Sequence, residues 1–181
     1  MRIINLLSYF IFVKILRTNF FYARYIDGDV IKVLSNGGTI TENIIKHSEY
    51  SLNLMRVFSL LANDKGLKFI NVGANIGSTV RNAKYFGFQN ILALEPSSLN
   101  YKALNDNCKR YGVETVKAGV GELRGEAVLN INEGSNGRNS FVRSSPTGVF
   151  ENVEILPLDD IWTKECYLFA DVEGYELEVL K

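Results

Sequence analysis

The residues best suited to chemistry lie in a glycine-rich turn near the middle of the sequence. Residues 69–77 read FINVGANIG and begin with an apolar, strand-like stretch. Glycine lets the backbone turn tightly and approach a ligand closely, because a Cβ atom would collide with it. The turn opens a predicted helix near Ser78, whose free N–H groups can receive a carboxylate or a phosphate. The segment predicts a ligand-binding turn, with a plain structural turn as the alternative, since many nucleotide-binding folds use glycine here.

An acidic residue follows the next predicted strand. Glu95 ends the apolar segment at residues 90–94, and Pro96 and Ser97 fix the turn after it. A carboxylate at the C-terminal end of a parallel strand points into the ligand crevice of an open sheet, where it can accept hydrogen bonds from both ribose hydroxyls. Together with the glycine turn, Glu95 indicates a nucleoside site; the alternative is a solvated surface glutamate.

Asn75, which lies between Gly73 and Gly77, helps to distinguish between the possible nucleoside cofactors. Dehydrogenases place a second glycine two residues after the first, so that pyrophosphate can approach the backbone. In this chain the position two residues after Gly73 is Asn75. S-adenosylmethionine has no pyrophosphate and tolerates the asparagine. The sequence therefore favours S-adenosylmethionine, and an NAD-dependent oxidoreductase is the less favoured alternative.

Two further acids stand near the end of the sequence. Asp171 and Glu173 belong to the run DVEGYE, which starts within a predicted strand at residues 167–172. Both belong beside the same crevice, where one can contact the cofactor's ammonium group and one can orient or deprotonate an acceptor hydroxyl. The alternative, a helix N-terminus enriched in acids, explains Glu173 better than Asp171. We expect Asp171 or Glu173 to be the catalytic base.

These residues need a parallel sheet to bring them together. From residue 67 onward, strand-like and helical segments alternate, and Gly87 and Gly112 end two of the helices. This order predicts an α/β, Rossmann-like sheet that is mostly parallel, with helices on both faces. Residues 67–181 are the expected ligand-binding core. Residues 1–66 are expected to form a small α+β appendage of a helix, a hairpin and a further helix.

Five segments together resemble the FkbM family of S-adenosylmethionine-dependent methyltransferases. In chain order they are INVGANIGS, ALEPSSLNYKALNDNCK, GVGELRGEAVLNI, VEILPLDDI and LFADVEGYELEVLK. The resemblance covers residues 67–181. It implies a class I methyltransferase that binds S-adenosylmethionine and O-methylates a hydroxyl of a sugar, polysaccharide or related metabolite, so the expected partner is a small-molecule or glycan acceptor.

The resemblance also implies roles for individual residues. Gly73, Asn75 and Gly77 form the cofactor turn, and Glu95 holds the ribose. Glu122 falls where the family has an acid near the adenine, and Asp171 and Glu173 fall at the methyl-transfer end. No metal ligand is expected. The expected cofactor-binding residues are Asn71, Gly73, Ala74, Asn75, Gly77, Glu95, Pro96, Ser97, Asn100, Glu122 and Asp171.

Two features depart from the family's pattern. Asn71 stands where the family usually has an aspartate, which removes a charge-assisted bond to the cofactor's ammonium group worth about 1 kcal/mol or more. The sequence also ends soon after the fourth predicted core strand, so we expect a truncated core without strands five to seven. The fourth strand would then be an open edge that favours self-association. Both features favour a non-catalytic cofactor-binding remnant as the alternative function.

Two weaker candidates lie outside these motifs. His47 is the sole histidine and would suit a general base if its segment folds over the crevice, although a lone histidine is more often a surface or packing residue. The loop at residues 134–143 offers Arg138, Asn139 and Arg143 as polar contacts to a substrate. A solvated loop is the equal alternative.

Charge and cysteine content limit the partners and the compartment. Twenty Lys and Arg balance 20 Asp and Glu, so no net field draws the chain to nucleic acid or to an anionic membrane. Cys108 and Cys166 lie far apart and in no metal-like spacing. They indicate reduced thiols in a cytoplasmic protein.

The start of the sequence is strongly apolar. Residues 3–13 are flanked by Arg2, Lys14 and Arg17. This stretch is shorter than the roughly 20 residues that a membrane-spanning helix needs. We expect a helix that packs on the domain or, through residues 3–17, lies at a membrane surface.

Overall fold

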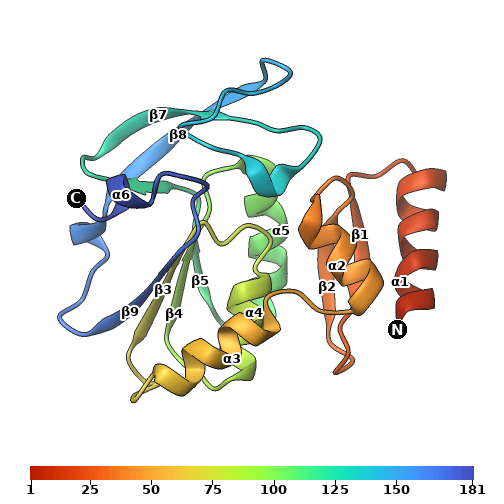
Figure 1. The fold of residues 1–181 in the computed structure, drawn as a ribbon, viewed down its shortest axis with the longest axis horizontal. Helices are drawn as coiled ribbons and strands as arrows, with labels where there is room; N and C mark the ends of the chain where they lie inside the picture. The colour runs from red at the N-terminus through yellow and green to blue at the C-terminus, as the bar shows by residue number, and fades with distance from the viewer.

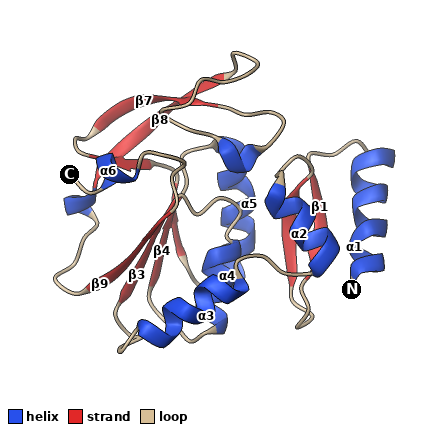
Figure 2. Ribbon diagram, in the orientation of Figure 1, coloured by secondary structure: helices blue, strands red, loops and turns tan.

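The computed structural model describes residues 1–60 and 62–181 in full, and Leu61 only as the last residue of a helix. The described residues form a mixed α/β structure with sheets of two, four and three strands. The two-stranded sheet and its helices stand at one side, beside α5 (Ser98–Cys108), and the three-stranded sheet covers one end of the central four-stranded sheet (Figures 1 and 2).

The N-terminal part is a helix, a hairpin and a second helix. The helix α1 (Arg2–Tyr9) continues as the π-helical turn η1 (Phe10–Ile15). It packs on the antiparallel pair β1 (Phe20–Arg24) and β2 (Val30–Leu34), which α2 (Thr39–His47) follows. The turn between the two strands contains Gly28, at φ +91°. Gly37 and Gly38 lie in the segment that leads from β2 into α2.

The central sheet has the strand order β5-β4-β3-β9, and all its pairs are parallel, as the sequence predicts. Its strands are β3 (Lys68–Val72), β4 (Ile91–Leu94), β5 (Glu114–Val116) and β9 (Cys166–Ala170). The crossovers through α4 (Ser78–Tyr85) and α5 run in the same direction along the sheet, so right-handed connections place both helices on one face. The helix α3 (Leu52–Leu61), from within the expected appendage, packs on the same face through Met55 and Phe58.

The opposite face is covered differently. Its core joins Ile70, Leu92 and Val179, and its helical cover consists of η4 (Leu158–Asp160) and the single turn α6 (Glu176–Val179). Both faces therefore carry helices, as expected, but one face has three helices of at least eight residues and the other has only two short ones. The reason is that the chain between β5 and β9 forms the second sheet rather than a long crossover helix.

The second sheet has the order β6-β8-β7. Its strands are β6 (Gly119–Gly121), β7 (Gly125–Asn130) and β8 (Phe150–Pro157), with β8 antiparallel to β7 and parallel to β6. The sequence indicates β7 and β8, but β6 has a single apolar side chain, Val120, and gives no strand pattern. The loop between β7 and β8 lies over the carboxyl end of the central sheet (Figure 1).

The topology of the central sheet places a crevice at this carboxyl end. The chain leaves β3 toward β4 and β5 and returns to the other side of β3 as β9. Open α/β sheets bind ligands where the strand order reverses in this way. Gly73, Glu95 and Asp171 directly follow β3, β4 and β9, so the topology brings them to one edge.

Candidate functional site

The glycine turn after β3 is held in a backbone conformation that its residues permit. Gly73, Asn75 and Gly77 have φ angles of +78°, +51° and +88°, a region that glycine enters freely and asparagine tolerates. The N–H groups of Gly73 and Ala74 donate to the carbonyl of Leu94 at 3.0 and 2.9 Å. A Cβ atom on Gly73 would collide with the carbonyl oxygen of Asp171. The turn therefore draws the ends of β3, β4 and β9 together.

The carboxylate of Glu95 lies against this turn. Its Oε2 accepts the backbone N–H of Asn75 at 2.9 Å, and its Oε1 accepts the backbone N–H of Ser97 at 3.0 Å. The side chain of Asn100 approaches Oε1 at 3.4 Å. Glu95 is 5% exposed; this burial raises its pKa to about 7, against the opposing effect of the hydrogen bonds from Ser97 and Asn75. A ligand that offers further donors would favour the ionised form.

Two adjoining cavities lie at the same edge. The larger has a volume of about 540 Å³ and the smaller of about 40 Å³. Both are lined by Gly73, Asn75, Asp171 and Glu173. Ala74 lines only the larger cavity, while Glu95, Pro96 and Asn100 line only the smaller one. The structure thus brings most of the predicted site residues to these two cavities.

The two acids after β9 differ in what holds them. The Glu173 carboxylate accepts Arg143 Nη1 at 3.0 Å, and the Glu173 backbone is left-handed at φ +53°. The Asp171 carboxylate has no hydrogen-bond or ion-pair partner among the described residues. Partial burial, and to a smaller extent the charge of Glu176, raise the pKa of Asp171. Asp171 is therefore the acid that is free to interact with a ligand.

Some predicted residues lie away from the cavities. Gly77 and Ser97 belong to the two turns but line neither cavity. A Cβ on Gly77 would lie 3.0 Å from the Leu104 side chain, and Ser97 is 2% exposed. Glu122 is exposed after β6 and lines neither cavity. His47 is exposed at the end of α2 and lines a separate hollow, so the structure does not bring it to Asp171 and Glu173.

Asn71 has an unusual environment. It is 1% exposed on β3, and neither its amide nitrogen nor its amide oxygen has a hydrogen-bond partner. It does not line either cavity. Buried amides are normally hydrogen-bonded, so this pair of unsatisfied atoms is costly.

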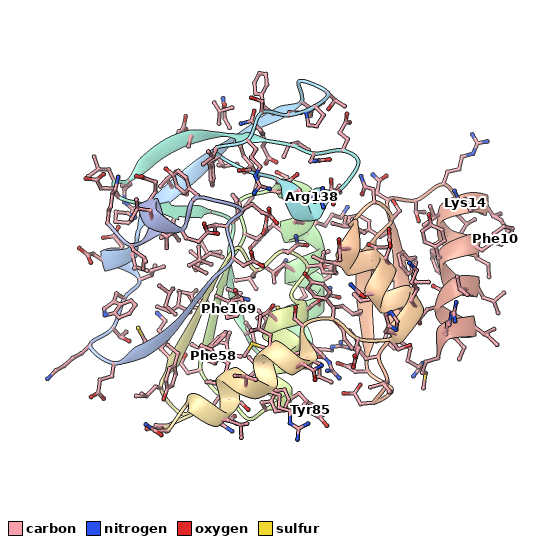
Figure 3. All side chains as sticks on the ribbon, viewed as in Figure 1. Phe10, Lys14, Phe58, Tyr85, Arg138 and Phe169 are labelled. Carbon is pink, nitrogen blue, oxygen red and sulfur yellow. The ribbon has the colours of Figure 1, made fainter. Side chains whose placement is uncertain are left out.

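Sequence reasoning missed two residues that line the larger cavity, Tyr50 and Phe169. Tyr50 lines the larger cavity; burial raises its pKa, and the nearby charges of Asp171 and Glu173 add to the effect. Phe169 of β9 also lines it, on the side where Phe58 packs (Figure 3). The candidate loop at residues 134–143 does reach this edge: Arg138 and Arg143 line the larger cavity, and Asn139 lines the smaller one (Figure 3). The hydrophobic type of Phe169 indicates only a core residue, and nothing in the sequence near Tyr50 indicates a site.

The loop between β7 and β8 is fastened to the N-terminal part. The Asn136 backbone N–H and side-chain amide donate to the carbonyl and the side-chain oxygen of Asn36, at 3.1 and 3.0 Å. Asn36 Nδ2 donates to the carbonyl of Glu133 at 2.7 Å. On its inner side, the Asn136 carbonyl accepts Asn100 Nδ2 at 3.1 Å. We call this set the Asn36–Asn136 clasp; it holds in place Asn136, which lines the smaller cavity.

Comparisons with known proteins give one clear result. A search of curated proteins finds no match to the chain. The family described as the methyltransferase FkbM domain matches residues 71–181, more than half of the chain and the whole stretch that carries the glycine turn, Glu95 and the two acids. The chain therefore belongs to the FkbM methyltransferase family.

Proposed function

We propose that this chain binds S-adenosylmethionine at the carboxyl edge of its central sheet and uses it to methylate a hydroxyl of a sugar, polysaccharide or related metabolite. The observation that carries the proposal is the position of the Glu95 carboxylate, which contacts the backbone of Asn75 beside the cavity that Asp171 lines. A ribose acceptor, a glycine turn and a free acid are thus within reach of one nucleoside. Membership of a methyltransferase family supports the choice of cofactor.

The residues present suit the cofactor. Each Glu95 carboxylate oxygen accepts one backbone N–H group, which leaves lone pairs to which ribose hydroxyls can donate. Gly73 has no side chain that would occupy the two cavities it lines. The larger cavity has room for the rest of the cofactor and for an acceptor. Asn71 and its unsatisfied amide stand below this turn, where the family usually has an aspartate.

When bound, S-adenosylmethionine supplies a methyl group already activated by its sulfonium charge. The chain's own task is to align the acceptor hydroxyl and to remove its proton. Asp171 takes that proton, because its carboxylate is free and its raised pKa brings it closer to the range of an effective base near neutral pH. Glu173, held by Arg143, positions the acceptor instead.

Calorimetric titration and a methyl-transfer assay test this proposal. The chain is titrated with S-adenosylmethionine and, separately, with NAD, and then incubated with methyl-labelled S-adenosylmethionine and a pool of hydroxylated sugars. We expect binding of the first ligand only, together with label transfer. Asp171→Asn should lower turnover about 100-fold or more while cofactor affinity stays within about twofold.

Asp159→Asn is the matched control, since Asp159 is an exposed acid of η4 that lines neither cavity. It should transfer label like the unmodified chain. Binding of NAD in place of S-adenosylmethionine would contradict the proposal. Cofactor binding without transfer to any acceptor would instead favour the non-catalytic remnant.

A further inference from the structure

The helix formed by α1 and η1 has two apolar faces. Tyr9, Phe12 and Val13 pack toward β1 and the N-terminal core. The opposite face is apolar as well, and its side chains are 44–73% exposed. It consists of Ile3, Ile4, Leu6, Leu7, Phe10, Ile11, Ile15 and Leu16. We call this set the outer face of the N-terminal helix. Figure 3 shows Phe10 and Lys14 at the rim of the molecule, away from the catalytic edge.

Asn5 determines which face points outward. It is fully buried, and its amide nitrogen donates to the carbonyls of Arg24 and Ile44, each at 3.0 Å. Its amide oxygen accepts the backbone N–H of Arg24 at 2.7 Å. Rotation of the helix about its axis would break these bonds and leave the backbone groups of Arg24 and Ile44 without these partners, at considerable cost. The outer face is therefore held outward by specific polar contacts.

The charge around the outer face has one sign. Residues 1–26 contain four basic residues, Arg2, Lys14, Arg17 and Arg24, and no acidic residue. Lys14 and Arg17 are exposed at the C-terminal end of the helix, and Arg2 is exposed at its start. An apolar face bordered by exposed cations is suited to an anionic lipid surface, where the side chains enter the acyl boundary and the cations meet the headgroups.

The same charges disfavour a second copy of the chain as the occupant. A twofold dimer through this face would set it against itself. The face offers no acid to meet Arg2, Lys14 or Arg17 of the other copy, so like charges would meet across the contact. An anionic surface supplies the missing countercharge.

We propose that the N-terminal helix binds the protein peripherally to an anionic membrane, with its outer face in the headgroup–acyl boundary. Residues 2–15 make about 21 Å of helix at a rise of about 1.5 Å per residue, less than the hydrocarbon thickness of about 30 Å. None of the described helices is long and apolar enough to cross a bilayer. Because Tyr9, Phe12 and Val13 of the helix pack on the protein, the proposed position of the helix is along the membrane surface. This proposal does not depend on the methyltransferase activity.

Vesicle co-sedimentation of the full chain tests it. Vesicles of phosphatidylcholine with about one third phosphatidylserine are compared with pure phosphatidylcholine. We expect binding to the anionic vesicles only, and a loss of binding at high salt. Phe10→Glu should lower the partition coefficient at least about tenfold, because it removes a large apolar contact and adds a repelled charge. Lys14→Gln should lower it about fivefold.

Leu60→Glu is the matched control, since Leu60 is a 78% exposed apolar residue of another helix; it should bind like the unmodified chain. Circular dichroism verifies that all variants fold. Absent binding to anionic vesicles, or equal losses in Phe10→Glu and Leu60→Glu, would overturn the proposal. The proposal would also be overturned if the chain formed a dimer that Phe10→Glu dissociates and that anionic vesicles do not affect. Titration with S-adenosylmethionine in solution reports separately on the catalytic site.

Discussion

The Glu95 carboxylate accepts the backbone N–H of Asn75 at 2.9 Å, although 20 positions separate the two residues in the sequence. This bond ties the end of β4 to the turn after β3, so the backbone itself fixes where the acid stands. The bond from Ser97 holds the other carboxylate oxygen at 3.0 Å. Glu95 is thus both a support of the turn and the proposed ribose acceptor.

The first prediction concerns that acceptor. Glu95→Ala should weaken S-adenosylmethionine binding by about 2–3 kcal/mol, because two hydrogen bonds to a buried carboxylate are lost. Isothermal titration calorimetry measures the change. Glu126→Ala, at an exposed acid of β7, is the control and should bind normally. Equal affinity in the Glu95 variant and the unmodified chain would disprove the ribose assignment.

The second prediction is a pH dependence of the same affinity. Burial raises the pKa of Glu95 to about 7, so below that pH the free protein is mostly protonated there, and the ionised form is the better acceptor of ribose hydroxyls. Affinity should therefore rise with pH, by about tenfold per pH unit well below pH 7, and level off above it. Calorimetry across pH 5.5–8.5, a range of about three units around this pKa, follows the change. Glu95→Gln should give a flat profile; a sloping profile in that variant would assign the titration to another group.

The third prediction compares two glycines with positive φ. Gly73 has φ +78° and no room for a Cβ beside the Asp171 carbonyl, whereas Gly112 has φ +60° and nothing within 4 Å. Gly112→Ala should lower the free energy of unfolding by about 1–2 kcal/mol for backbone strain alone. Gly73→Ala should lower it by about 2 kcal/mol more, because the backbone of β9 must also move. Urea denaturation measures both free energies of unfolding. Equal losses in the two variants would show that the backbone of β9 moves aside without cost.

The fourth prediction concerns the unsatisfied amide of Asn71. Asn71→Leu should raise the free energy of unfolding by about 1 kcal/mol or more, since it removes two buried polar atoms without partners. Urea denaturation measures the effect. A clear loss of stability would mean that Asn71 is hydrogen-bonded in solution.

The sequence is informative where a residue's place follows from strand topology. Gly73, Glu95 and Asp171 each follow an apolar run, and parallel strands bring their C-terminal ends to one edge. That rule suffices to predict the parallel sheet and to group these three residues. It requires no knowledge of loop conformation.

The rest of the site depends on loops that no local pattern fixes. Tyr50 reaches the cavity from the segment between α2 and α3, and Arg138 from the loop between β7 and β8. Their positions arise from packing between parts of the chain far apart in sequence. Glu122 shows the converse: its motif places it near the site, yet the chain after β6 carries it to the exposed surface.

The Asn36–Asn136 clasp makes one wall of the smaller cavity depend on the segment that joins β2 to α2. Asn136 and Glu95 both line that cavity, and the bonds from Asn36 to Asn136 and Glu133 hold the loop that carries Asn136. Replacing Asn36 with alanine would remove the side-chain bonds and loosen this wall, although residue 36 itself lines neither cavity.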